Sequence, residues 1–142
     1  MTVLLALFLC VLAGAIALVH AMWALGSHWP ASSEEELVRR AAGDGRRRMP
    51  PAWQCLVVAL LLAGVAVWPW LMLDRAADHT MASVTYAIAG AFIARGVAGY
   101  SVRWRQHFTQ EPFATYNRRY YSPCCLLLGA GYVALLAGEL DK

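Results

Sequence analysis

Four long apolar blocks, separated by segments that carry most of the charge, constrain the fold of this chain more than any other feature. The blocks are 3–25, 52–73, 81–100 and 123–140. A helix of about 20 apolar residues crosses a hydrocarbon core of about 30 Å. Apolar residues make up 60% of the chain and charged residues 15%, against about 45–50% and about 25% in soluble domains. The sequence therefore predicts an all-α fold, a four-transmembrane-helix bundle that forms a single transmembrane domain over 1–142.

Basic residues are concentrated in two of the three connections between these blocks. They are Arg39, Arg40, Arg46, Arg47 and Arg48 in the first connection, and Arg103, Arg105, Arg118 and Arg119 in the third. Only Arg75 and Lys142 lie on the opposite side. Because positively charged connections resist translocation, we expect both long connections in the cytoplasm and both termini outside it.

The two long connections have helical signals of their own. Ser33 with Glu36 three residues later forms a capping box, which predicts a short cytoplasmic helix between helices 1 and 2. Tyr100, Trp104 and Phe108 recur every four residues beside arginines, which predicts an interfacial segment in which the third helix runs out along the membrane surface. Nucleic-acid surfaces use the same residue types. In a chain this apolar we favour membrane lipids as the partner and expect no nucleic acid.

Two polar residues lie inside apolar blocks at similar depth, and such residues are candidates for function. His20 and Arg95 both stand about five residues before the cytoplasmic end of their helix, and Trp23 shares a helix face with His20. These side chains could meet in one cavity. In the alternative interpretation, Arg95 extends its guanidinium to the interface and His20 is satisfied by a backbone carbonyl.

Sequence motifs for catalysis and metal binding are missing. The chain has no phosphate-binding loop, nucleophile elbow or His-Glu-x-x-His motif, and none of the four blocks carries an acidic residue near its centre. His28, His79 and His107 have no spacing typical of a ligand set. We expect no catalytic residues, no metal and no cofactor.

Three motifs resemble an uncharacterised family of bacterial four-helix integral membrane proteins, a domain of unknown function. They are the His-x-x-Trp-x-x-Gly stretch from His20 to Gly26, the end of the third helix from Arg95 to Tyr100, and the stretch from Phe113 to Pro123 with its Tyr-Ser-Pro motif. The resemblance covers nearly the whole chain and implies a multi-pass protein of the bacterial cytoplasmic (inner) membrane. The family pattern usually has acidic residues near Gly99 and at Asn117, and both are absent here.

Two functions fit these features. The first is a non-enzymatic interaction protein, such as an accessory subunit or an immunity-type partner of a membrane protein or toxin, or a homo-oligomer, because small residues at helical spacing favour close helix packing. The third block is richest in them, with Ala87, Gly90, Ala91, Ala94 and Ala98. The alternative is a binder of an anionic lipid or small anionic ligand in a cytoplasmic-side pocket, and an extension of this alternative is a lipid-modifying enzyme. The candidate ligand-binding residues are His20, Trp23, Arg95, Arg119, Tyr121 and Ser122. Ser122 and Pro123 are also a good start for the fourth helix.

Overall fold

A computed structural model describes residues 2–74 and 79–140 and confirms the all-helical fold. The long helices are α1 (Thr2–Ala24), α3 (Ala52–Asp74), α4 (His79–Ala98) and α7 (Ser122–Leu140). Three shorter helices lie in the connections: α2 (Glu34–Ala41), α5 (Val102–His107) and α6 (Phe113–Tyr116). A π-helical turn, Asn117–Tyr121, joins α6 to α7. Four helical segments are long and apolar enough to cross a membrane, and the last of them runs from α6 through α7.

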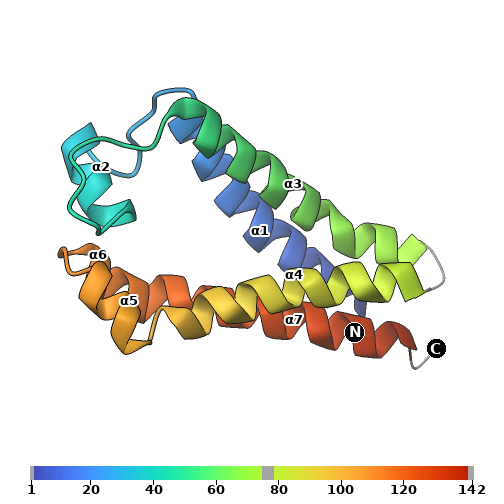
Figure 1. Ribbon diagram of the computed structural model, residues 1–142. Coiled ribbons are helices and arrows are strands. Elements are labelled where there is room, and N and C mark those ends of the chain that lie inside the picture. Colours follow the sequence, from blue (N-terminus) through green and yellow to red (C-terminus); the bar gives the residue numbers. More distant parts are fainter. Residues whose placement is uncertain (1, 75–78, 141–142) are drawn as a thin grey trace.

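The long helices form two pairs. α1 packs along α3, and α4 packs along α7. Figure 1 shows that the pairs meet near the start of α1 and the end of α7 and diverge toward the two long connections. The short helices α2, α5 and α6 all lie at this diverging end, which we call the open end. Both arginine-rich connections therefore share one end of the molecule.

The core lies where the two pairs meet. Leu9, Met72, Leu128 and Tyr132 are almost completely buried there and come from three of the long helices. The Tyr132 hydroxyl donates a hydrogen bond to the Val65 carbonyl at 2.6 Å and so ties α7 to α3. The apolar core fills this end of the bundle. The polar side chains that line cavities lie at the open end instead.

Glycine allows the close approach of α4 and α7. A Cβ atom on Gly129 would lie 2.5 Å from Cγ1 of Ile93 and 3.0 Å from the Ala89 carbonyl oxygen. Such separations are far inside van der Waals contact, so only glycine fits at this position. Without a hydrophobic driving force between helices in lipid, tight packing of this kind is what holds them together.

The third long helix does not continue unbroken into the Tyr100–Phe108 stretch. α4 ends at Ala98, and α5 begins as a separate helix with Ser101 as its N-cap. The Ser101 hydroxyl oxygen accepts a hydrogen bond from the Trp104 backbone N–H at 3.1 Å. A capped break of this kind lets the chain turn, and it directs Trp104 toward α4.

α7 begins at Ser122, but Ser122 does not act as the N-cap that the sequence predicts. Ser122 has helical torsion angles, φ −66° and ψ −46°, and its N–H bonds to the Asn117 carbonyl five residues back. Proline has no N–H, and its ring would crowd the carbonyl four residues before it. The wider π turn directly before Pro123 avoids this conflict, so the helix continues from α6 into α7 without a new start.

The short helix of the first connection is present. The Ser33 hydroxyl accepts a hydrogen bond from the Glu36 N–H at 3.3 Å, and α2 ends at Ala41. The Glu36 carboxylate accepts hydrogen bonds from Ser32 rather than from the Ser33 backbone. These bonds, with Arg40 nearby, hold the pKa of Glu36 below its usual value.

Candidate functional site

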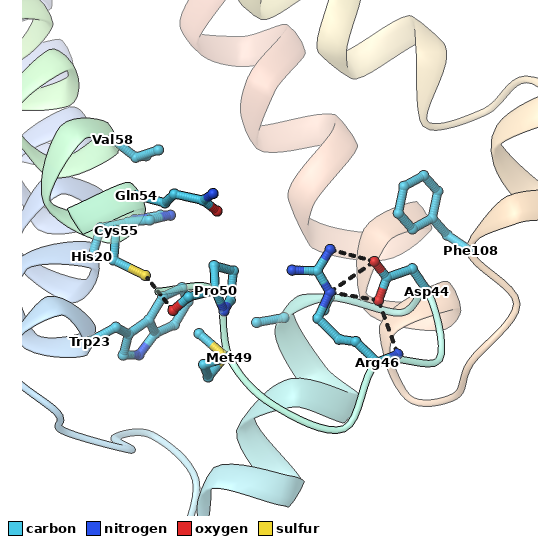
Figure 2. A pocket seen from close by; sticks show the side chains of 12 residues that line it. His20, Trp23, Asp44, Arg46, Met49, Pro50, Gln54, Cys55, Val58 and Phe108 are labelled. Atoms are coloured by element: carbon cyan, nitrogen blue, oxygen red, sulfur yellow. Dashed lines mark hydrogen bonds and ion pairs between the residues drawn. The ribbon is translucent and has the colours of Figure 1, made fainter. Parts of the chain in front are cut away.

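Two cavities lie at the open end of the molecule. The first has a volume of about 290 Å³ and is lined by His20, Trp23, Gln54 and the Asp44–Arg46 pair, among others. Figure 2 shows the α1 and α3 side chains on one side of it, Phe108 on the other, and the loop that holds Asp44 and Arg46 between them. We call this the inter-arm cavity, because α1 and α3 line one side of it and Phe108, from the connection between α4 and α7, lines the other (Figure 2).

His20 and Trp23 form one wall of the inter-arm cavity. Their ring centroids are 4.8 Å apart, as expected for residues three positions apart on a helix. The Nδ1 atom of His20 lies 2.8 Å from the Ile16 carbonyl oxygen. A carbonyl oxygen only accepts, so Nδ1 carries the proton, and the neutral ring has its lone pair on Nε2. The Trp23 indole N–H donates to the Trp29 carbonyl at 2.8 Å, so this side chain offers the cavity only its ring.

Asp44 and Arg46 bring opposite charges to the same cavity. The Arg46 Nε atom lies 2.9 Å and 2.8 Å from the two Asp44 carboxylate oxygens. Hydrogen bonding to Arg46 lowers the pKa of Asp44, and the same bonds raise the pKa of Arg46. Both groups are therefore charged at neutral pH, and the pair contributes no net charge.

Arg95 lies in a different cluster, between α4, α5 and the π turn. Its Nη2 atom donates to the Asn117 side-chain oxygen at 3.0 Å, and its guanidinium carbon is 4.3 Å from the centre of the Trp104 ring. Asn117 is buried, and its amide nitrogen donates to the Gly99 carbonyl at 3.0 Å. Ser122 completes the cluster with its hydroxyl 3.4 Å from the Asn117 oxygen. We call these residues the Arg95 cluster.

Gly99 is required by the Arg95 cluster. A Cβ atom at this position would lie 1.9 Å from the Ser122 hydroxyl oxygen and 2.9 Å from the Asn117 amide nitrogen. It would also stand 3.1 Å from Nη1 of Arg95. The absence of a side chain at Gly99 therefore lets the end of α4 close against the π turn.

A second cavity, of about 250 Å³, lies beside this cluster. Gly99, Trp104 and Asn117 line it from the cluster side, and Arg105 and Arg118 line it from outside. Among the described residues that line it, Glu111 is the one acid, and its carboxylate accepts hydrogen bonds from the Thr115 N–H and hydroxyl. We call it the arginine-rich cavity, and Phe108 forms part of the lining of both cavities.

Two donors in the Arg95 cluster have no acceptor. Among the residues that the structure describes, Arg95 Nη1 and Trp104 Nε1 are the buried side-chain nitrogen or oxygen atoms without a hydrogen-bond partner. Burying such a group unpaired costs about 1–3 kcal/mol, and more when it is charged. Unpaired buried donors are rare in proteins, and each one calls for an explanation such as strain, a functional role, or a water or ion that it binds.

The structure distributes the predicted site residues over several places. His20 and Trp23 line the inter-arm cavity, whereas Arg95 and Ser122 belong to the Arg95 cluster. Arg119 is exposed on the surface. The Tyr121 hydroxyl donates to the Arg40 carbonyl at 3.0 Å and so ties the π turn to the end of α2. Arg95 is not among the described residues that line the inter-arm cavity with His20.

Sequence reasoning missed the partners of Arg95. The sequence predicts an interfacial role for Trp104 but does not predict that its ring stacks on Arg95 and on Phe108. Asn117 carries no local signal, because its contact with Arg95 depends on how the chain turns 22 residues later. Across the described ranges, no three His, Cys, Asp or Glu side chains come together as metal ligands.

Together, the helical bundle and its two cavities define a small all-helical protein with four helices that could span a membrane. Residues 4–132 match the family described as "Protein of unknown function (DUF3995)", and the chain belongs to this family. No curated protein and no solved structure matches the chain.

Proposed function

We propose that this protein is a multi-pass protein of the bacterial inner membrane that binds an anionic group in the arginine-rich cavity. The group belongs to a lipid headgroup or to a small soluble anion. The observation that carries this proposal is the pair of buried donors without an acceptor, Arg95 Nη1 and Trp104 Nε1, beside a cavity lined by two further arginines.

The missing partner of these donors must be a hydrogen-bond acceptor. The oxygen of Asn117 already accepts hydrogen bonds from Arg95 Nη2 and from the Ser122 hydroxyl, so both of its lone pairs are used. Arg105 and Arg118 outnumber Glu111 in the cavity lining, and an excess of arginine attracts anions. An anion is therefore a better partner for these donors than a neutral acceptor.

Access to the two donors requires a small movement. Both nitrogen atoms are sealed from solvent in this closed arrangement. α5 has only six residues and follows a break at Gly99–Ser101, so it makes few helical hydrogen bonds of its own. We infer that α5 and Trp104 shift when the anion enters.

The orientation that we propose places this site at the cytoplasmic face. Both arginine-rich connections lie at the open end, opposite the start of α1 and the end of α7 (Figure 1). Positive residues near helix ends favour the cytoplasmic side. This arrangement supports both termini outside the cytoplasm and the two cavities at the level of the inner-leaflet headgroups.

The binding proposal is tested by native mass spectrometry of the protein released from nanodiscs that contain an anionic phospholipid. We expect Arg95→Gln and Arg118→Gln to lower the retained anionic lipid by about tenfold, as loss of a charged hydrogen bond does. Trp104→Phe keeps an aromatic ring but removes the N–H, and it should lower retention in the same direction. Inorganic phosphate added to the detergent-solubilised protein, with thermal unfolding as readout, separates a soluble anion from a lipid.

Two matched controls make this test specific. Arg119→Gln changes an exposed neighbour of Arg118, and Arg103→Gln changes an exposed residue of α5; the described lining of the arginine-rich cavity includes neither. Both controls should retain lipid as the original protein does. The site is rejected if the three site variants and the two controls all retain as much lipid as the original protein. It is also rejected if the two controls lose as much lipid as the three site variants.

A second candidate function, an interaction protein, is favoured by one observation on α4. Ala87, Gly90, Ala91 and Ala94 are exposed, and a Cβ atom on Gly90 would meet nothing within 4 Å. Small residues on a lipid-facing surface permit close packing of a further helix. The same mass spectra report a second copy of the chain or a co-purified membrane protein, and a monomer in every spectrum counts against this candidate.

A further inference from the structure

The inter-arm cavity differs from the arginine-rich cavity in the charges and hydrogen-bonding groups that it presents. Asp44 and Arg46 are both in its lining, and their charges cancel. The described lining of the arginine-rich cavity contains two arginines, Arg105 and Arg118, and one glutamate, Glu111. A simple anion is therefore not the ligand that the inter-arm cavity fits best.

His20 adds a hydrogen-bond acceptor to the inter-arm cavity. Because Nδ1 faces the Ile16 carbonyl at 2.8 Å, the neutral ring keeps its lone pair on Nε2. A lone pair repels a phosphate or carboxylate oxygen and attracts an N–H or O–H group. A ligand of this cavity should therefore bring a hydrogen-bond donor.

The walls and the remaining polar groups favour a cationic donor that is attached to an anionic group. Trp23 offers only the face of its indole, since its N–H is already bonded to Trp29, and aromatic faces attract ammonium groups. Arg46 Nη1 takes part in none of the bonds to Asp44 and can donate to an oxyanion. Gln54, also in the lining, can donate and accept.

We propose that the inter-arm cavity binds a zwitterionic group of the phosphoethanolamine type. Its ammonium lies toward His20 and the Trp23 ring, and its phosphate accepts hydrogen bonds from Arg46, which Asp44 holds in place (Figure 2). The volume of about 290 Å³ suits a headgroup rather than a whole lipid. The acyl chains of a bound lipid would then lie outside the cavity.

This inference is independent of the anion site, because the two cavities use different polar residues and share only the Phe108 ring among their described lining residues. Native mass spectrometry from nanodiscs with equal parts of phosphatidylethanolamine and phosphatidylglycerol tests it. Asp44→Asn removes the charge that holds Arg46 in place for the phosphate, and His20→Phe keeps a ring but removes the acceptor for the ammonium. Each should lower retained phosphatidylethanolamine by about tenfold and leave retained phosphatidylglycerol unchanged.

Matched controls keep the test interpretable. Glu35→Gln removes an acidic charge from the same connection, and His28→Phe replaces a histidine outside the described lining of either cavity. Both should retain phosphatidylethanolamine as the original protein does. Arg118→Gln, which tests the anion site, should also leave phosphatidylethanolamine retention unchanged, so the two proposals can fail separately.

A soluble ligand shows whether the cavity binds the free zwitterion or the headgroup of a lipid. Glycerophosphoethanolamine should raise the unfolding temperature of the original protein in detergent, but not that of Asp44→Asn, if the cavity takes the free headgroup. Retention of phosphatidylethanolamine without this effect assigns the cavity to the lipid. Phosphatidylethanolamine retention in Asp44→Asn and His20→Phe equal to that of their controls would overturn the inference.

Discussion

At the scale of single residues, Gly99 is the position on which the Arg95 cluster depends most directly. The end of α4 approaches the π turn so closely here that any Cβ atom would collide with the Ser122 hydroxyl, at 1.9 Å. Neither Ser122 nor Asn117 can retreat easily, because both are buried and Asn117 is bonded to Arg95 and to the backbone. The positions of the unpaired donors, Arg95 Nη1 and Trp104 Nε1, therefore depend on glycine at position 99, where no side chain holds α4 away from the π turn.

We expect Gly99→Ala to destabilise the protein by about 1–3 kcal/mol, as overpacking of a tight contact does. Thermal unfolding in mild detergent measures the change. Gly90→Ala is the matched control, because nothing lies within 4 Å of its Cβ position and alanine has the higher helix propensity. An unfolding temperature for Gly99→Ala at or above that of Gly90→Ala would contradict the close packing of α4 on the π turn.

Single residues also show where sequence reasoning succeeds and where it stops. The proximity of His20 and Trp23 follows from their spacing on one helix, and the bond from His20 to a backbone carbonyl was the alternative already considered. The partners of Arg95 could not be predicted, because Trp104 and Asn117 reach it only after the chain has turned twice. Local periodicity carries no information about those turns.

At the scale of elements, the π turn between α6 and α7 organises the open end. It places Arg118 in the lining of the arginine-rich cavity and Asn117 against Arg95, and it directs the Tyr121 hydroxyl to the Arg40 carbonyl. The long apolar helices were predictable from hydrophobic length alone. The π turn was not, because a single extra residue per turn leaves the apolar pattern of the following helix unchanged.

We expect Tyr121→Phe to loosen α2 without unfolding the bundle. The substitution removes the hydrogen bond from the Tyr121 hydroxyl to Arg40 and keeps the aromatic ring, which lies 5.8 Å from the Phe113 ring. A lost hydrogen bond of about 0.5–1.5 kcal/mol should speed amide exchange in α2 by about two- to tenfold. Hydrogen–deuterium exchange of peptides covering Glu34–Ala41 measures it.

Tyr120→Phe provides the control for this prediction, because Tyr120 is the adjacent tyrosine and its side chain is 60% exposed. It should leave exchange in α2 unchanged. If both tyrosine variants exchange alike, the contact between the π turn and α2 does not stabilise α2.

At the scale of the whole molecule, the two ends of the bundle formed by the helix pairs differ in composition and in proposed role. The end where they meet is closed by a core of large apolar side chains, including Leu9, Met72 and Tyr132. The open end holds both cavities and both arginine-rich connections. Packing is thus separated from the sites, so that substitutions at the open end can alter binding with little effect on the core.

The orientation that we propose for the molecule in the membrane is based on the same difference between its two ends. Both connections that carry arginine clusters lie at one end, and the start of α1 and the end of α7 lie at the other (Figure 1). If the open end faces the cytoplasm, the two cavities meet the inner leaflet, where anionic headgroups attract basic segments. Both proposed sites depend on that orientation.

Reporter fusions measure this orientation most directly. Alkaline phosphatase fused after Lys142 should be active, and green fluorescent protein fused at the same point should be dark, because the first requires export and the second requires the cytoplasm. Phosphatase inserted after Arg47 should be inactive. A fluorescent fusion after Lys142 together with active phosphatase after Arg47 would place the open end outside and contradict both sites.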